Sequence, residues 1–196
     1  MGVRWGEAPR YSDRRASVRT DEELMAAART GSRDAFEGLF ERYRDPVWRF
    51  FRRRVGEPDR AADLAQETFV ALMRGAGRYE PRGSFRAYLF GIAYNVLFSD
   101  QRNVARRVAD PLDGSEVSPA ADPETALWVR QALAALESDD REILLLREYE
   151  QLSYLEIAEL RSVSLNTVKS RLFRARMALK AALEARATAG MGHENR

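Results

Sequence analysis

The chain has 196 residues, with 32 Lys and Arg against 30 Asp and Glu, no cysteine and one histidine. The lack of cysteine excludes disulfides, thiolate metal sites, iron–sulfur clusters and cysteine nucleophiles. His193 lies in the stretch GMGHENR near the C-terminus, so neither a histidine base nor a multi-histidine metal site is expected. The apolar runs are far shorter than the roughly 20 residues of a membrane-spanning helix, and residues 1–20 lack a signal-peptide core. We expect a soluble cytoplasmic protein with no metal, no cofactor and no membrane insertion.

Helical periodicity dominates the first half of the sequence. Ser32, Asp45-Pro46 and Ser84 have the residue types that cap or start helices, and Gly31 and Gly56 the type that ends them. The sequence predicts a separate third helix that begins at Asp45-Pro46. Five helices are expected, at 21–30, 33–44, 46–55, 58–77 and 84–102.

Residues 109–124, ADPLDGSEVSPAADPE, have three prolines, five acidic residues and no basic residue. This composition is typical of an extended linker, with a plain solvated tether as the simplest interpretation. Helical periodicity resumes near residue 125. The sequence therefore predicts an all-α protein of two small helical domains with a flexible linker between them. Its parts are a lead-in at 1–20, a first domain at 21–108, the acidic linker at 109–124, a second domain at 125–186 and a tail at 187–196.

Charge is unevenly distributed within the second domain. Residues 137–159 carry eight acidic residues against two arginines, whereas residues 161–180 carry six basic residues and no acid. SYLEIAEL, RSVS and LNTVKSRLFRAR follow one another as a short helix, a four-residue turn and a longer helix. This is the helix-turn-helix pattern, in which the second helix enters the major groove of DNA.

The second helix of this pattern offers side chains for DNA contact, although a solvated basic face on an ordinary helix pair is the alternative. Candidates for base edges or nearby phosphates are Asn166, Thr167, Lys169, Ser170 and Arg171. Candidates for phosphate contact are Arg174, Arg176 and Lys180.

The segment 78–102 interleaves arginines with aromatic residues. Some of the aromatic side chains must lie in the core, since Phe85 and Leu89 follow helical spacing. Tyr79, Tyr88 or Tyr94 could stack on unpaired bases while arginines hold the backbone.

Taken together, DRAADLAQETFVALMR at 59–74, FRAYLFGIAYNVLFSDQR at 85–102 and LSYLEIAEL…NTVKSRLFRARMAL at 152–179 resemble bacterial sigma factors of the extracytoplasmic-function (ECF) group. The resemblance covers nearly all of residues 21–185. It implies sigma region 2 in the first domain and sigma region 4 in the second, with no folded domain between them. By this resemblance the chain is a transcription-initiation factor with no catalysis of its own.

The resemblance implies three sets of site residues. Core RNA polymerase, through the clamp coiled coil of its largest subunit, would contact Asp63, Leu64, Gln66, Glu67 and Val70. The minus-ten promoter element would contact Arg78, Arg82, Arg86, Tyr88, Asn95, Asp100 and Arg102. The minus-thirty-five element would contact Asn166, Thr167, Lys169, Ser170, Arg171, Phe173, Arg174 and Arg176.

The partners that the resemblance implies are core polymerase, whose flap would meet the second domain, promoter DNA and an anti-sigma factor. The chain would act as a monomer. The alternative is a conventional helix-turn-helix regulator whose N-terminal domain dimerises or senses a ligand. Three positions depart from the group's pattern. Tyr88 stands where tryptophan is frequent, and Ser162 and Asn166 stand where glycine is common, so a left-handed backbone at Ser162 would be strained.

Overall fold

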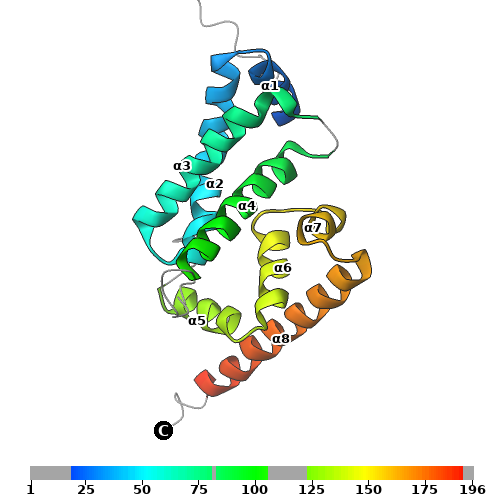
Figure 1. Cartoon of the computed structure of the whole chain (residues 1–196). Helices are drawn as coiled ribbons and strands as arrows, with labels where there is room; N and C mark the ends of the chain where they lie inside the picture. The colour runs from blue at the N-terminus through cyan, green and yellow to red at the C-terminus, as the bar shows by residue number, and fades with distance from the viewer. Residues whose placement is uncertain (1–18, 81–82, 106–122, 192–196) are drawn as a thin grey trace, which may run out of the picture.

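The computed structural model describes residues 19–80, 83–105 and 123–191 (Figure 1). Within these ranges the chain forms helices and turns, with no strand. The all-α prediction is therefore confirmed. The helices are α1 (Asp21–Arg29), α2 (Arg33–Val55), α3 (Pro58–Gly75), a 3-10 turn η1 (Ala76–Arg78), α4 (Phe85–Ala105), α5 (Pro123–Ala134), α6 (Ser138–Glu148), α7 (Tyr154–Arg161) and α8 (Leu165–Met191).

Short-range hydrogen bonds fix the helix ends in the first half. The Ser32 hydroxyl accepts a hydrogen bond from the Ala35 N–H at 3.3 Å, and the Ser84 hydroxyl accepts one from the Ala87 N–H at 3.1 Å. Gly56 ends α2 with a φ of 74°, a conformation that glycine adopts at little cost. The predicted caps at Ser32 and Ser84 and the predicted end at Gly56 are confirmed.

The predicted helix start at Asp45-Pro46 is wrong, because α2 runs through Pro46 without a break. Proline lacks the N–H that would bond to the Arg42 carbonyl, which ordinarily disfavours the helix interior. Val47, Phe50 and Phe51 are fully buried and continue the apolar stripe of α2 across this point. Burial of these side chains, each contributing about 1.5–3 kcal/mol, outweighs the local cost of proline.

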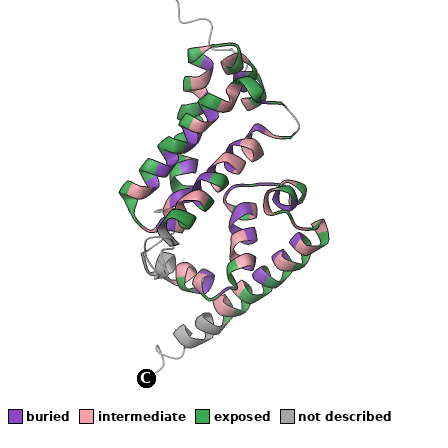
Figure 2. Ribbon diagram, viewed as in Figure 1, coloured by how far each residue is buried: buried purple, intermediate pink, exposed green. Residues whose placement is uncertain are grey.

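Helices α1 to α4 enclose the first core, with α3 packed against both α2 and α4, and with α4 running alongside α3 (Figures 1 and 2). The inward side chains of the four helices form this core. Among the fully buried ones are Met25, Leu39, Phe50, Phe51, Leu72, Phe85, Leu89 and Phe90.

Helices α6, α7 and α8 form the second core, with α5 packed on α8. Its fully buried side chains include Ile143, Leu146, Leu152 and Ile157. The predicted linker, 109–124, lies almost wholly outside the described residues, and α5 begins at its last two positions. In Figure 1, α6 and α7 lie beside α4, so the second half of the chain packs against one side of the first.

Candidate functional site

The outer face of α3 is polar along one edge. Asp63, Gln66, Glu67 and Val70 are exposed, as the sequence predicts for a docking helix. Leu64 is not available on this face, because it is only 5% exposed and lies on the inward stripe of α3. The expectation that Leu64 contacts a partner is therefore wrong for this structure.

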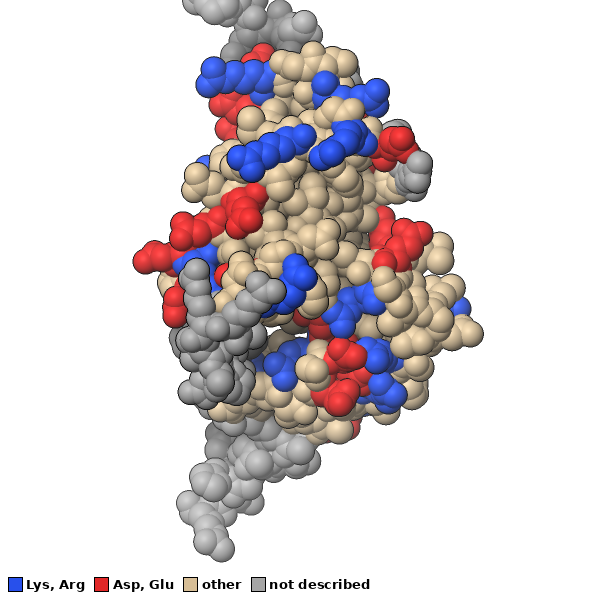
Figure 3. Space-filling model, viewed as in Figure 1, with Lys and Arg blue, Asp and Glu red and all other residues tan. Residues whose placement is uncertain are grey.

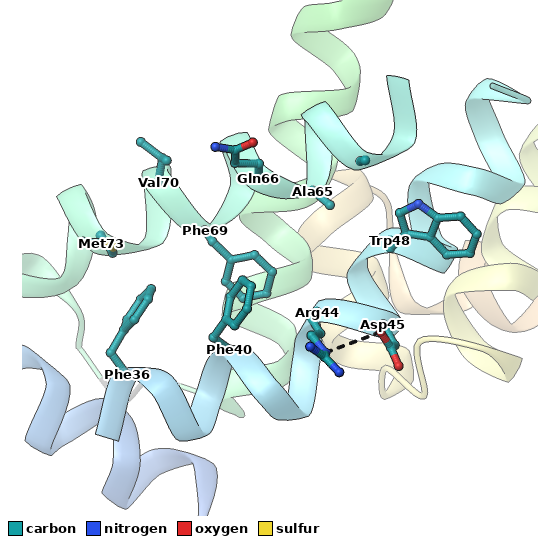
Figure 4. A pocket seen from close by; sticks show the side chains of 11 residues that line it. Phe36, Phe40, Arg44, Asp45, Trp48, Ala65, Gln66, Phe69, Val70 and Met73 are labelled. Atoms are coloured by element: carbon teal, nitrogen blue, oxygen red, sulfur yellow. Dashed lines mark ion pairs between the residues drawn. The ribbon is translucent and has the colours of Figure 1, made fainter. Parts of the chain in front are cut away.

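Beside this polar edge lies an apolar hollow between α2 and α3, with a volume of about 560 Å³ (Figure 4). Its walls include four partly exposed large apolar side chains, which is unusual for a helix pair whose other faces are buried or charged. The Phe40 and Phe69 rings meet edge to face at 4.8 Å between centroids, which holds Phe40 against the wall. The partly exposed side chains are Phe40, Trp48, Val70 and Met73.

The contribution of α2 to this hollow does not follow from the sequence. Phe40 belongs to a repeat that includes Leu39 and Tyr43, both buried, so the periodicity places it in the core. Phe40 and Trp48 are instead 39% and 36% exposed. The signal that could have identified them is the width of the apolar stripe, which exceeds what one packed face of a helix needs.

The segment 78–102 divides into buried and exposed side chains. Tyr79 is 4% exposed and packs on Tyr88 with 4.8 Å between ring centroids, so stacking of Tyr79 on a base is contradicted in this structure. Burial raises the pKa of the Tyr79 hydroxyl above its ordinary value. Tyr88 and Tyr94 are partly exposed and keep the predicted stacking role open.

The other predicted minus-ten residues are not equally accessible. Arg78, Asn95 and Arg102 are exposed, and the Arg102 guanidinium lies 4.9 Å from the ring centroid of Phe98, which is itself 53% exposed. Asp100 accepts a hydrogen bond from Arg60 at 2.5 Å. The two remaining predicted residues are Arg82 and Arg86. Arg82 lies outside the described residues, and Arg86 Nε donates to the Glu150 carbonyl oxygen at 2.6 Å.

The helix-turn-helix is formed by α7 and α8, with local geometry close to prediction. Ser153 and Glu156 cap the start of α7 reciprocally through a capping box. Ser162 adopts the left-handed conformation, with φ 52° and ψ 43°, so the strain that the sequence implies at this position is present. The Ser164 hydroxyl accepts a hydrogen bond from the Thr167 N–H at 3.0 Å and so caps α8.

One face of α8 is exposed, while Val168, Leu172 and Ala175 are buried against the rest of the domain. This arrangement leaves a row of polar side chains and one aromatic ring directed away from the core. The exposed predicted contact residues include Asn166, Lys169, Ser170 and Phe173, the last of them 67% exposed. This row includes residues for which the sequence predicts contact with the major groove.

The arginines of α8 are less free than the sequence implies. Arg171 and Arg161 share the carboxylate of Asp139, and Arg174 is paired with Asp140 at 2.8 Å. Arg176 is paired with Glu148 at 2.7 Å, and its hydrogen bonds to Glu148 and Tyr154 raise its pKa. On the face in Figure 3, acidic and basic side chains lie close together over the second domain, so no uniform basic field covers it. Lys169, which is exposed, makes no ion pair with any described residue.

Among the described residues, no cluster of His, Cys, Asp and Glu could hold a metal ion. Over the same residues, no helix is long and apolar enough to cross a membrane.

Comparison with known sequences matches the two halves of the chain in order. Residues 39–107 match the family described as Sigma-70 region 2, and residues 126–179 match Sigma-70, region 4. The RNA polymerase sigma factor YlaC of Bacillus subtilis is 32% identical over an alignment of 158 positions that covers 76% of this chain and 91% of that protein. The ECF RNA polymerase sigma factor SigM of Mycobacterium tuberculosis is 32% identical over an alignment of 165 positions that covers 82% of this chain and 83% of that protein.

Solved structures agree with these matches. The sigma factor RpoE from Bartonella quintana, in complex with the anti-sigma factor NepR, superposes with a TM-score of 0.63 at 26% identity, over 76% of this chain and 96% of that one. CnrH in complex with the cytosolic domain of CnrY gives a TM-score of 0.62 at 26% identity, over 84% of this chain and 97% of that one. The chain belongs to the sigma-70 family of RNA polymerase sigma factors, in its ECF group.

Proposed function

We propose that this chain brings core RNA polymerase to promoters and helps to open promoter DNA there. The observation that carries the proposal is the presence, on one family-matched chain, of an exposed apolar hollow on α2 and α3 and a helix-turn-helix on α7 and α8. The first suits a protein partner and the second suits duplex DNA. Nucleotidyl transfer is then the chemistry of the polymerase, and the chain works in the cytoplasm.

The polymerase contact is assigned to the exposed edge of α3 together with the hollow. Apolar side chains in a pocket with a polar rim form the usual centre of a protein interface. Val70 and Met73 would supply the apolar centre, and Asp63, Gln66 and Glu67 the polar rim. By the family resemblance, the partner surface is the clamp coiled coil of the largest polymerase subunit.

Contact with the minus-ten element is assigned to α4 and the turn before it. Moving a base out of the duplex costs a few kcal/mol, which stacking and hydrogen bonds in a pocket repay. Tyr88 and Tyr94 are partly exposed and would stack on bases, and the exposed Asn95, Arg78 and Arg102 would make polar contacts.

Contact with the minus-thirty-five element is assigned to the exposed row on α8. Asn166, Lys169 and Ser170 lie at the start of the helix, where side chains reach base edges. Phe173 can contact the methyl group of thymine. Arg171 and Arg174 would reach phosphates only by leaving or sharing Asp139 and Asp140.

The domain limits are proposed as 21–108 for sigma region 2 and 125–186 for sigma region 4, with 109–124 as the linker. The linker's five acidic residues suit a path along a basic nucleic-acid channel of the polymerase. An anti-sigma factor is a further proposed partner, because the similar sigma factor RpoE is solved in complex with the anti-sigma factor NepR.

Binding to core polymerase tests the first part of this proposal. Val70→Asp places an unpaired charge in the centre of the hollow, so the affinity of the chain for core polymerase should fall at least tenfold. Ala26→Asp, on the exposed side of α1, is the matched control and should bind as the wild type does. The measurement is co-migration with core polymerase in gel filtration over a concentration series. Equal affinity of the Val70→Asp and wild-type chains would contradict the assignment.

A further inference from the structure

Two side chains of α1 contact the two ends of the segment that joins η1 to α4. The Arg29 guanidinium donates a hydrogen bond at 3.2 Å to the carbonyl oxygen of Tyr79, which ends η1. The Glu22 carboxylate accepts one at 3.0 Å from the N–H of Phe85, the first residue of α4. Glu22 and Arg29 lie about two helical turns apart on α1, so both are on the same face of this helix. One short helix therefore contacts both η1 and α4.

The helix α1 is itself held on α2. One carboxylate oxygen of Asp21 accepts a hydrogen bond from the Tyr43 hydroxyl, and the other pairs with Arg42 at 2.8 Å. Leu24 and Met25 of α1 are buried in the first core. Burial and the hydrogen bond to Asp21 raise the pKa of the Tyr43 hydroxyl, so near neutral pH this hydroxyl keeps its proton and donates. The helix is therefore a fixed support for the residues that it contacts.

The contact with Glu22 acts on the first turn of α4. The first N–H groups of a helix have no partner within the helix, and the helix dipole favours a carboxylate near them. The Ser84 hydroxyl accepts one of these N–H groups, that of Ala87. Glu22 accepts another, that of Phe85, whose ring is fully buried and meets the Tyr43 ring edge to face with 5.4 Å between centroids. Glu22 thereby fixes the start of α4 from outside that helix.

The contact with Arg29 acts on Tyr79, whose ring supports Tyr88. Tyr79 is 4% exposed, and its hydroxyl is buried without a hydrogen-bond partner among the described residues. The polar contacts of Tyr79 are made by its backbone: the N–H donates to the Ala76 carbonyl oxygen at 3.1 Å, and the carbonyl oxygen accepts from Arg29. The Tyr79 and Tyr88 rings pack with 4.8 Å between centroids. The position of the Tyr88 ring thus depends on Tyr79 and, through its backbone, on Arg29.

We propose that Glu22 and Arg29 are positioning residues for contact with the minus-ten element. Through the backbone of Tyr79 and Phe85, they set where the Tyr88 ring meets an unpaired base. The inference rests on the proposed function of α4. Because stacking depends on the offset and separation of two rings, a small displacement of Tyr88 weakens it. The helix α1 would then act on promoter opening without touching DNA.

A double-mutant cycle with holoenzyme tests this proposal. The probe is a promoter on which the chain initiates in run-off transcription, with a mismatched bubble over its minus-ten element, so that binding does not include the cost of opening. Arg29→Ala should lower the affinity for this probe about threefold to tenfold, because the stacking contact is misplaced. Arg29→Lys keeps a donor for the Tyr79 carbonyl oxygen and should recover most of the loss.

The same substitution in a Tyr88→Ala chain distinguishes positioning from a general loss of stability. There Arg29→Ala should change the affinity less than about twofold, because the ring that Arg29 positions is absent. Equal losses in the two backgrounds would overturn the proposal, since Arg29 would then act independently of Tyr88. Arg33→Ala, an exposed cation at the start of α2, is the matched control for lost positive charge and should leave the affinity unchanged.

Glu22 separates positioning from direct electrostatics. Glu22→Ala removes the acceptor for the Phe85 N–H and should weaken binding to the bubble probe. A direct effect of charge would have the opposite sign, because loss of an acid favours binding to DNA phosphates. Glu22→Gln keeps an acceptor oxygen and should bind as the wild type does. Tighter binding by Glu22→Ala, or equal binding by Glu22→Ala and the wild type, would overturn the proposal.

Fluorine NMR of the full chain decides the proposal without DNA or polymerase. The chain is labelled with fluorotyrosine, and Tyr88→Phe identifies the Tyr88 signal. Arg29→Ala should shift this signal and leave those of Tyr149 and Tyr154 in the second domain unchanged. If the wild-type chain initiates on no promoter, the proposed function fails, and this spectrum still decides the positioning. An unmoved Tyr88 signal would overturn it.

Discussion

At the scale of single residues, the acidic side chains of α6 determine which cations of α8 are already paired within the chain. Asp139 holds Arg161 and Arg171, and Asp140 holds Arg174 with two hydrogen bonds. These pairs fix the angle between α6 and α8 and neutralise part of the basic helix. Lys169 is left as an exposed cation on the row that faces away from the core.

Lys169→Ala should therefore weaken promoter binding by the holoenzyme several-fold, since one phosphate or base contact is lost. The slope of log affinity against log salt should fall by about 1 if the contact is to a phosphate. Anisotropy titrations at several salt concentrations measure both quantities. Arg33→Ala, an exposed cation at the start of α2, removes the same charge away from the helix-turn-helix and should change neither. Unchanged affinity with Lys169→Ala would exclude this residue from the DNA contact.

Ser162 gives a prediction about stability. Its φ of 52° is costly for a side chain with a Cβ and nearly free for glycine. Ser162→Gly should stabilise the second domain by about 0.5–1 kcal/mol in urea unfolding.

Ser164, two residues further on, provides a control in which the expected change in stability has the opposite sign. Its hydroxyl caps α8, so Ser164→Ala should destabilise the domain by about 1 kcal/mol. Loss of stability with Ser162→Gly would show that the left-handed turn is not strained.

At the scale of the helices, local signals identified most ends, and tertiary packing decided the exception. The caps at Ser32 and Ser84 depend on residues three positions apart, so the sequence carries them. The break expected at Pro46 did not occur, because Val47 and Phe50 continue a buried stripe that the core requires. Propensity is a weak prior when a whole helix face is buried.

Pro46→Ala tests this explanation. The substitution restores an N–H that can bond to the Arg42 carbonyl and removes the steric conflict of the ring, so the free energy of unfolding should rise by about 1–3 kcal/mol. Urea unfolding followed by circular dichroism measures it. A fall in stability would mean that the proline ring itself makes an important contact.

The candidate site was predictable only where its residues are close in sequence. The exposed residues on the edge of α3 recur at helical spacing along that one helix, and so do those in the row on α8. Both sets can therefore be recognised from the sequence. The apolar hollow needs α2 beside α3, and the pairing of Arg54 with Glu150 spans 96 positions. Helical periodicity identifies which side chains share a face and does not identify which faces meet.

At the scale of the whole molecule, the formal net charge of +2 conceals a segmented arrangement. Acidic residues of α6 pair with arginines of α8 on one side, and Glu142 of α6 and the following Glu150 pair with arginines of α2 on the other. The second domain thus uses its acids twice, once to orient its own DNA-binding helix and once against the first domain. Different carboxylates make the two contacts: Asp139, Asp140 and Glu148 pair with α8, whereas Glu142 and Glu150 pair with α2.

Run-off transcription tests the central claim most directly. Purified core polymerase would be assayed on a set of candidate promoters with the wild-type chain, with Val70→Asp and without any added chain. We predict promoter-specific transcripts with the wild type, at least tenfold fewer with Val70→Asp, and none without the chain. Absence of transcripts that depend on the chain, together with dimeric binding to DNA without polymerase, would contradict the assignment as an initiation factor.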